Sequence, residues 1–412
     1  MNFARQLSEL TSSAAIRKVT LALFLVVLGA SAALAQTKAY VTNNNDSTIS
    51  VIDTATNTVT TTIPAGPLPV GIAVTPNGAF AYVANQGDGT VSVIDTATNT
   101  ITATVAVGPS PLFVAITPNG AFAYVTDVSF GVRVLDTATN TVVASVPIFF
   151  PSSIAITPNG AFAYVTGVFS NINVISTATN TIVATIPITF SFSETVDIVI
   201  APNGAFAYVA AVPNSLVIDT ATNTVTATLP PSLAIDVSPN GQFLYLNTPD
   251  SLLVVDTATN TAVASIPLGL INRFAGGVKV SPNGDSVYVV NFFSNTVSVI
   301  STATNTVTST VPVGNGPVAI AFSSPDPFGS LLNQVQALIA AGNLTQNQGA
   351  GLIDKLNQVV TKLDAGQTGA ACNQMSAFIN QVQALINSGA LTQAEGQSLI
   401  DAGNSIKTNL GC

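Results

Sequence analysis

The sequence contains no histidine, no tryptophan and only two cysteines among its 412 residues. The absence of histidine removes the most common general base and the most common transition-metal ligand in proteins. Serine and threonine are abundant, but neither has a histidine to activate it as a nucleophile. This composition argues against an enzyme, although it does not exclude one, and we expect neither a cofactor nor a metal site.

Charged residues are also scarce, at 7% of the chain, whereas hydrophobic residues reach 48%. Acidic residues outnumber basic ones by 19 to 10, which gives a net charge of −9. Proteins that bind nucleic acid neutralise phosphates with clustered lysine and arginine, and this chain has no such cluster. We therefore expect no nucleic-acid partner. Low charge with abundant valine, isoleucine, threonine and glycine favours many short strands joined by tight turns.

The N-terminus has the pattern of a secretory signal peptide. Arg17 and Lys18 precede an uncharged run over residues 19–30, and Ala33-Leu34-Ala35 offers small residues for cleavage. The alternative is a transmembrane anchor, but the apolar run is too short to span a bilayer comfortably. We expect a signal peptide at residues 1–35, export to the periplasm, cell surface or medium, and a mature chain without a transmembrane anchor.

The dominant feature of the sequence is an internal repeat of 37 to 44 residues. All seven tyrosines of the chain occupy the same position in it: Tyr40, Tyr82, Tyr124, Tyr164, Tyr208, Tyr245 and Tyr288. Each copy contains four strand-like segments separated by turn signals, which is the pattern of a β-propeller blade. We predict an all-β seven-bladed β-propeller over residues 36–325. Its last inner strand, near residues 318–323, should complete the first blade and close the ring.

Copies such as AYVTNNNDSTISVIDTATN, at residues 39–57, resemble the YVTN β-propeller repeat of bacterial and archaeal envelope and surface-layer proteins. The resemblance covers residues 39 to about 325. It implies a secreted or cell-surface propeller, and it transfers no catalytic residues because the repeat motif is structural. Propellers that hold a quinone cofactor stack it on an aromatic floor, and the absence of tryptophan disfavours that class.

The most regular polar residues are interpreted as turn residues. Aspartate or serine at the head of each DTATN-like segment can accept hydrogen bonds from backbone N–H groups two residues on, and the asparagine tolerates a left-handed backbone. The repeated Pro-Asn-Gly segments have the same character, with glycine supplying positive φ. The tyrosines should pack between blades with their hydroxyls satisfied. Both turn series should lie on one face of the disc.

Loops of the opposite face vary in length and composition and gather phenylalanine. These residues are Phe130, Phe149, Phe150, Phe169, Phe190, Phe192, Phe274, Phe292 and Phe293. An exposed apolar patch usually marks an interface, so one interpretation is a surface for a partner or a hydrophobic ligand. The other is that several of these rings turn inward and plug the mouth of the channel. Oxygen-rich loops at residues 43–46 and 85–88 could hold calcium, but ordinary turn chemistry is favoured because no ordered aspartate spacing is present.

Two inner-strand positions carry charge where most repeats have alanine or valine. They are Asp236 and Lys279, and Asp197 lies one strand position away from the equivalent site. Charge in an inner strand should be paired or hydrated, so these residues should meet beside the central channel, where Glu194 and Arg273 could join them. A structural ion pair is favoured over a ligand site.

The pattern changes after residue 325 to a helical period of about 3.6. The segment NQVQALIAAGNLTQ at 333–346 recurs as NQVQALINSGALTQ at 380–393, so we predict a small all-α domain of four helices over residues 326–412. Antiparallel helices would bring Cys372 and Cys412 together, and an exported protein would join them in a disulfide. Thr392 and Glu395 should form a capping box.

Three functions remain open from the sequence. The first is a secreted or envelope-associated scaffold that binds a protein partner through the phenylalanine-rich loop face. The second is a hydrolase or lactonase with an acid and a metal at the channel. The third is a structural component of a surface layer.

Overall fold

The computed structural model describes residues 37–167, 171–188, 197–268, 275–323, 327–364, 367–410 and 412. The chain divides into a β unit, Thr37–Ser324, and a second unit that includes Pro325–Cys412. Within the described part of the chain, no helix is long and apolar enough to cross a membrane.

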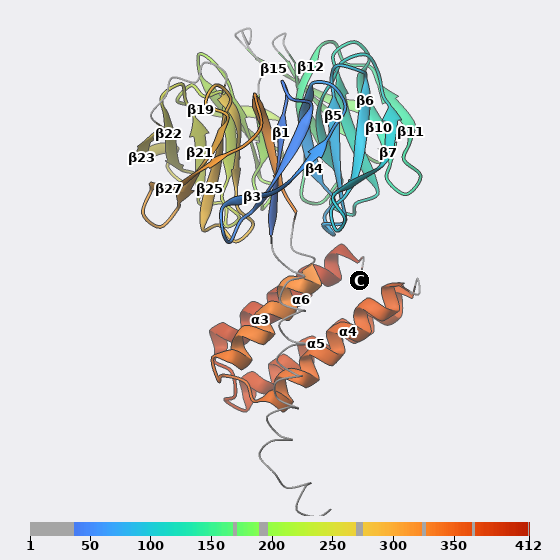
Figure 1. The fold of residues 1–412 in the computed structure, drawn as a ribbon, viewed down its shortest axis with the longest axis vertical. Helices are drawn as coiled ribbons and strands as arrows, with labels where there is room; N and C mark the ends of the chain where they lie inside the picture. The colour runs from blue at the N-terminus through green and yellow to red at the C-terminus, as the bar shows by residue number, and fades with distance from the viewer. Residues whose placement is uncertain are drawn as a thin grey trace, which may run out of the picture. The chain divides into compact units, whose positions relative to one another are not determined.

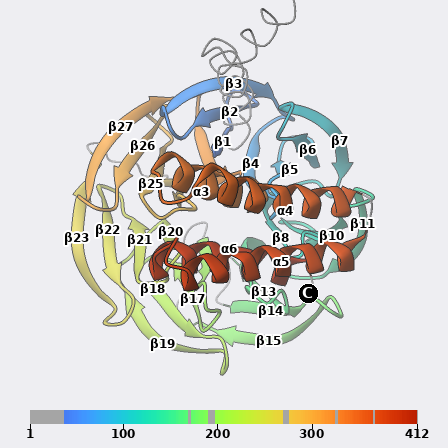
Figure 2. The ribbon, with the colours of Figure 1, turned by 90° about the horizontal axis from the view of Figure 1, so that it is seen from below.

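The β unit is a propeller of seven four-stranded sheets, seen along its axis in Figure 2. We number the blades along the chain and give their strands from the channel outward. Blade 1 is β28 (Pro317–Phe322), β1 (Lys38–Asn43), β2 (Thr48–Asp53) and β3 (Thr58–Pro64). Blade 2 is β4 (Pro69–Val74), β5 (Phe80–Asn85), β6 (Thr90–Asp95) and β7 (Thr100–Ala106). Blade 3 is β8 (Pro111–Ile116), β9 (Phe122–Asp127), β10 (Gly131–Asp136) and β11 (Thr141–Val146).

The remaining blades follow the same order. Blade 4 is β12 (Pro151–Ile156), β13 (Phe162–Gly167), β14 (Asn171–Ser176) and β15 (Thr181–Pro187). Blade 5 is β16 (Asp197–Ile200), β17 (Phe206–Ala210), β18 (Ser215–Asp219) and β19 (Thr224–Leu229). Blade 6 is β20 (Ala234–Val237), β21 (Phe243–Asn247), β22 (Ser251–Asp256) and β23 (Thr261–Pro267). Blade 7 is β24 (Ala275–Val280), β25 (Ser286–Asn291), β26 (Thr296–Ser301) and β27 (Thr306–Pro312).

The ring closes by pairing the two ends of the propeller sequence, as predicted. Strand β28 runs antiparallel to β1, with Tyr40 opposite Ala321. Beyond the strands, Ser323 N donates to Lys38 O at 2.8 Å, and Lys38 N donates to Ser323 Oγ at 3.0 Å. Figure 1 shows β1, in blue, beside the orange strand from the far end of the propeller sequence. This closure pairs β1 on both of its edges, with β28 and with β2, so the first blade has four strands like the others.

The two turn series have the chemistry predicted for them. Asp53 Oδ1 accepts hydrogen bonds from Ala55 N at 2.8 Å and Thr56 N at 3.0 Å. The asparagines that end these turns are left-handed in all seven blades, with φ between +53° and +55°. The glycines of the six Pro-Asn-Gly turns have φ between +71° and +79°, where a side chain would be strained. These turns join the inner strand to the second and the third to the outer, so they share one face, which we call the turn face.

The core of the propeller lies between blades. The cluster shared by blades 1 and 2, for example, contains Tyr40 and Val51 from one blade and Ile72 and Val83 from the next. The repeated tyrosines are almost completely buried in these clusters. Their hydroxyls donate to the turn asparagine of the following blade at 2.6 to 2.9 Å in five pairs: Tyr40–Asn99, Tyr82–Asn140, Tyr124–Asn180, Tyr164–Asn223 and Tyr288–Asn57. Each bond ties one sheet to the next.

The described residues after 326 form four helices, as predicted: α3 (Pro327–Ala340), α4 (Gln346–Asp364), α5 (Thr368–Asn387) and α6 (Gln393–Asn409). They pack around one apolar core that includes Leu331, Leu352, Met375, Phe378 and Leu399. Helices α4 and α6 begin with the same hydrogen-bond pattern. Thr345 N donates to Gln348 Oε1 before α4, and Thr392 N donates to Glu395 Oε2 before α6. The Thr392 capping box is therefore confirmed.

Cys372 of α5 and Cys412 form a disulfide with a Cα–Cα distance of 6.0 Å. The bond ties the chain end beyond α6 to the beginning of α5, so it holds together the two helices of the second hairpin.

Candidate functional site

The face opposite the turn face is built by the connections between second and third strands and between successive blades. We call it the loop face. Because these connections are not constrained by the repeated turn motifs, they differ from blade to blade. Most of the sequence-predicted phenylalanines fall in them, and their positions can be compared wherever the structure describes the loop.

The first described group of phenylalanines lies at blades 3 and 4. Phe149 and Phe150 connect β11 to β12, and their rings meet edge to face with centroids 4.5 Å apart. Phe149 is 76% exposed. Phe130, between β9 and β10, is half exposed, and the Arg133 guanidinium carbon lies 4.7 Å from the centre of its ring. A cation over an aromatic face is attracted by the ring quadrupole, so the Arg133 side chain helps to hold the exposed Phe130 ring in place.

The second described group lies at blade 7. Phe292 and Phe293 connect β25 to β26, with ring centroids 5.2 Å apart and planes nearly perpendicular. Phe293 is exposed and Phe292 half-buried. Two blades separate this group from the first in either direction around the ring. The remaining predicted residues, Phe169, Phe190, Phe192 and Phe274, lie outside the described residues, as do Glu194 and Arg273.

The structure brings the predicted channel charges together on neighbouring inner strands. Lys279 Nζ of β24 lies 3.2 Å from Asp236 Oδ1 of β20. The other carboxylate oxygen of Asp236 accepts a hydrogen bond from Val280 N at 2.8 Å. The Asp236 side chain is only 6% exposed, whereas that of Lys279 is 44% exposed. The ion pair therefore joins blade 6 to blade 7, with the lysine reaching water. The Asp236 carboxylate raises the pKa of Lys279 above its usual value, so Lys279 is charged at neutral pH.

Asp197 of β16 makes a similar connection between blades 4, 5 and 6. Its Oδ1 accepts from Ser153 Oγ at 3.1 Å and from its neighbour Ile198 N at 2.9 Å. Its Oδ2 accepts from Ile235 N at 3.3 Å. Burial raises the pKa of the Asp197 carboxyl, and the hydrogen bond from Ile235 N and the charge of Lys279 oppose that increase. Asp197 is thus a partly desolvated carboxyl that is close enough to Lys279 to be stabilised by its charge.

These carboxylates are engaged mainly in joining blades. Asp197 and Asp236 each accept from a backbone N–H of the next inner strand, which has no further strand on its channel side. A side-chain carboxylate that satisfies such a group stabilises the sheet edge. Ser153 was not selected from the sequence. It is a polar residue in an inner strand that is otherwise similar to the apolar inner strands of other blades, and this difference could have indicated a partner at the channel. Ser153 and Asp197 have no histidine partner, since the chain has none.

The two oxygen-rich loops, at residues 43–46 and 85–88, contain matching hydrogen bonds from an asparagine amide to two hydroxyls. Asn43 Nδ2 donates to Thr48 Oγ1 and Ser50 Oγ, and Asn85 Nδ2 donates to Thr90 Oγ1 and Ser92 Oγ. Among the residues that the structure describes, no three histidine, cysteine or acidic side chains gather closely enough to hold a metal ion.

Comparison with known proteins identifies the helical unit by sequence and the propeller by fold. Residues 328–408 match the FIMAH domain. No curated protein matches the chain in sequence. The solved structure of hydrazine synthase from Kuenenia stuttgartiensis is similar, with a TM-score of 0.57 and 24% identity over 64% of this chain and 92% of that one. A functionally unknown protein from Desulfotomaculum acetoxidans has a TM-score of 0.61 and 20% identity, over 70% of this chain and 99% of that one. At these identities the two likenesses show the fold alone. No family match confirms the resemblance to the YVTN repeat.

Proposed function

We propose that this chain is an exported, non-catalytic binding propeller of the YVTN type that holds a protein partner at the cell envelope through the phenylalanines of its loop face. In this proposal residues 1–35 are the signal peptide, 36–325 the propeller and 326–412 the helical domain that matches FIMAH over most of its length. The observation that carries the proposal is the Phe149–Phe150 pair, in which a ring 76% exposed is held edge to face against its neighbour.

The energetic argument rests on the cost of exposing these rings. Burying a phenylalanine side chain contributes about 1.5–3 kcal/mol, and aromatic residues are frequent among the few interface residues that dominate affinity. Phe149, Phe130 and Phe293 expose half or more of their surface on the loop face. The edge-to-face contacts restrict the rings before a partner arrives, which lowers the entropy lost on binding. Preorganised exposed aromatics are typical of a binding surface.

The test compares two double variants of the full chain as bait in envelope extract. Phe149→Ser with Phe150→Ser removes the loop-face pair. The matched control, Phe80→Ser with Phe162→Ser, removes two rings that are 36% and 39% exposed on the turn face. We expect partners retained by the wild type and by the control to fall about ten-fold or more with the loop-face variant, since losing one buried ring contact is worth at least that much. The proposal is wrong if all three baits retain the same set of proteins.

A second function, a hydrolase or lactonase at the channel, is favoured by one observation. Asp197 combines a raised pKa with a nearby lysine and a serine hydroxyl at 3.1 Å, and perturbed carboxyls are enriched at catalytic sites. The discriminating measurement is hydrolysis of a panel of lactones and esters with the wild type and Asp197→Asn. Turnover that disappears with Asp197→Asn would support the enzyme, whereas equal background rates would remove it.

A further inference from the structure

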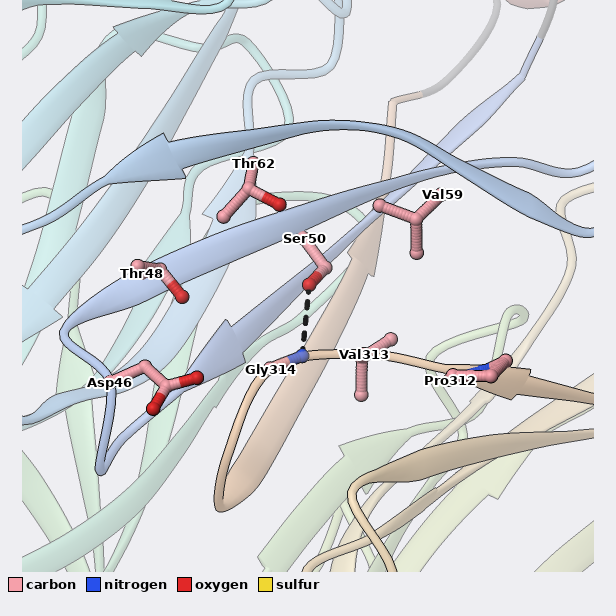
Figure 3. A pocket seen from close by; sticks show the side chains of 8 residues that line it. All are labelled: Asp46, Thr48, Ser50, Val59, Thr62, Pro312, Val313 and Gly314. Carbon is pink, nitrogen blue, oxygen red and sulfur yellow. Dashed lines mark hydrogen bonds between the residues drawn. The ribbon is translucent and has the colours of Figure 1, made fainter.

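A groove opens where the first and last blades meet (Figure 3). It has a volume of about 550 Å³, within the range of about 300–1,000 Å³ typical of small-molecule sites. Strands β2 and β3 of blade 1 form one side, and the connection from β27 to β28 forms the other. The lining residues are Asp46, Thr48, Ser50, Val59, Thr62, Pro312, Val313 and Gly314. None of them is a phenylalanine of the loop face, so the groove is a separate feature.

Two hydroxyl groups of the groove are oriented by the protein as hydrogen-bond donors. Ser50 Oγ accepts from Asn43 Nδ2 at 2.9 Å and from Gly314 N at 3.3 Å, the second of which is drawn in Figure 3. A hydroxyl oxygen has two lone pairs and one hydrogen, so both acceptor positions of Ser50 are filled. Thr48 Oγ1 accepts from the same amide at 3.0 Å. Neither hydroxyl hydrogen has an acceptor within the described part of the chain. Thr48 is half-buried and Ser50 only 1% exposed, so a ligand would have to enter the groove to reach the Ser50 hydroxyl.

The groove also offers an acceptor and an apolar surface. Asp46 Oδ2 accepts from Asn315 N at 2.5 Å, and Asp46 is an exposed residue, so its carboxylate is held by one bond and can accept another from a ligand. Val59, Pro312 and Val313 line the same groove with apolar atoms. The groove thus offers one carboxylate acceptor, two hydroxyl donors and an apolar wall. These features fit a ligand whose hydroxyl groups can both donate and accept hydrogen bonds and whose C–H groups can pack on apolar side chains. A sugar ring has these properties.

Charge excludes two other classes of ligand. An anion would meet Asp46 and a chain with a net charge of −9. A calcium ion takes about six to eight oxygen ligands and usually several carboxylates, whereas this groove contains a single carboxylate. We propose that the groove between blades 7 and 1 is a binding site for a neutral saccharide, with Ser50 and Thr48 as donors and Asp46 as acceptor. This proposal does not depend on the function proposed for the phenylalanine loops.

Blade 2 has the equivalent asparagine, threonine, serine and aspartate, but with different hydrogen-bond partners, and so it provides a control. Asn85 Nδ2 donates to Thr90 Oγ1 at 3.0 Å and to Ser92 Oγ at 2.9 Å, as Asn43 does in blade 1. There, however, Thr90 Oγ1 donates to Asp88 Oδ1 at 2.7 Å, so the threonine and the aspartate satisfy each other. The equivalent Asp46 is held by Asn315 N instead. The set in blade 1 is therefore open to a ligand where that in blade 2 is internally satisfied.

The experiment uses the full mature chain and three probes: maltose, cellobiose and N,N′-diacetylchitobiose. Saturation-transfer NMR detects which of them binds, and isothermal titration gives its dissociation constant. We expect Ser50→Ala to weaken binding about ten-fold or more, as for the loss of a hydrogen bond to a desolvated partner. Ser92→Ala removes the matching hydroxyl and the matching bond to asparagine in blade 2, and should leave the affinity within about two-fold.

Two further variants test the proposal. Asp46→Ala changes an exposed side chain, so the variant should fold and should also lose affinity. Saccharide binding that survives in the Phe149→Ser, Phe150→Ser variant would separate this site from the loop-face surface. The proposal is overturned if no probe shows saturation transfer, if Ser50→Ala and Ser92→Ala weaken binding equally, or if calcium rather than a sugar binds and is lost with Asp46→Ala.

Discussion

Tyr288 of blade 7 donates its hydroxyl hydrogen to Asn57 Oδ1 of blade 1 at 2.9 Å, although the two residues are 231 positions apart in the sequence. The bond repeats, at the point of closure, the contact that ties each of blades 1 to 4 to the next blade along the chain. It does not follow from the pairing of β28 with β1, since it joins the second strand of one sheet to the outer turn of another. The ring is thus closed twice, once by backbone pairing and once by side chains.

The first prediction concerns this bond. Tyr288→Phe should lower the free energy of unfolding by about 1 kcal/mol, because one buried hydrogen bond is lost. Asn57→Gly should cost a similar amount, since glycine keeps the left-handed backbone and removes only the acceptor. If the two groups interact, the double variant will lose little more than either single variant. Urea unfolding of the four proteins measures this coupling, and strictly additive losses would contradict it.

The second prediction is a loss of stability in alkali. Burial raises the pKa of Tyr82, Tyr124 and Tyr288 to about 12, and the nearby Asp136 and Asp53 add to the effect for Tyr82 and Tyr288. The unfolded chain releases these protons near pH 10 and the folded chain only near pH 12. Their contribution is therefore complete below pH 10 and is lost as the pH rises from 10 to 12.

Two spectroscopic signals check the alkaline transition. Tyrosinate absorbance near 295 nm and the far-ultraviolet circular dichroism of the strands should change together as the pH is raised. Ionisation of all seven tyrosines near pH 10 with the strand signal unchanged would contradict the burial of the hydroxyls.

The arrangement of the blades could be predicted from the sequence because the repeat is both regular and complete. Seven tyrosines in one register fix seven blades, and the count of strand-like segments leaves only the ends to pair with each other. The aspartate caps were also predictable, because the hydrogen bonds that they accept span two or three residues. The left-handed asparagines were predictable because asparagine tolerates that backbone conformation. The pairing of Asp236 with Lys279 followed from the cost of isolated charge in an inner strand.

Other contacts could not be predicted because they join residues whose proximity depends on the ring. Nothing in the local sequence of Asn57 indicates that Tyr288 is its donor. Ser153 meets Asp197 only because neighbouring inner strands converge on the channel. The groove at Asp46 and Gly314 forms from loops near opposite ends of the propeller sequence. Its difference from blade 2 depends on which donor Asp46 finds, because both blades have the same asparagine, aspartate, threonine and serine at these positions.

The third prediction concerns the disulfide. Cys372 and Cys412 are 40 residues apart, and closing a loop of that length stabilises a folded unit by about 4 kcal/mol on the chain-entropy estimate. Reduction, or Cys372→Ser, should lower the thermal transition of the helical unit and leave that of the propeller unchanged. Circular dichroism at 222 nm follows the helices during heating, and Tyr absorbance follows the propeller, because all seven tyrosines belong to it. A shift of both transitions would show that the disulfide acts beyond the helices.

The fourth prediction concerns a glycine inside α6. A Cβ added to Gly396 would lie 2.2 Å from Ile386 Cγ1, and Gly349 has the same relation to Ile339 in the first hairpin. Alanine normally stabilises a helix interior by about 0.5–1 kcal/mol relative to glycine, but here the overlap should cost about 1–3 kcal/mol. Gly396→Ala should therefore destabilise the helical unit. Combining it with Ile386→Ala should cost less than the sum of the two single losses, because the small side chain makes room for the new methyl group.

Gly369 provides the matched control for this change, because a Cβ added there would meet nothing within 4 Å. Gly369→Ala lies in α5 and should be neutral or slightly stabilising. Thermal unfolding of Gly396→Ala, Gly369→Ala and the Gly396→Ala, Ile386→Ala double variant is followed at 222 nm. It distinguishes the effect of steric overlap on stability from the effect of helix propensity. If Gly396→Ala and Gly369→Ala shift the transition in the same direction, the close approach of Ile386 to Gly396 does not determine the packing of this hairpin.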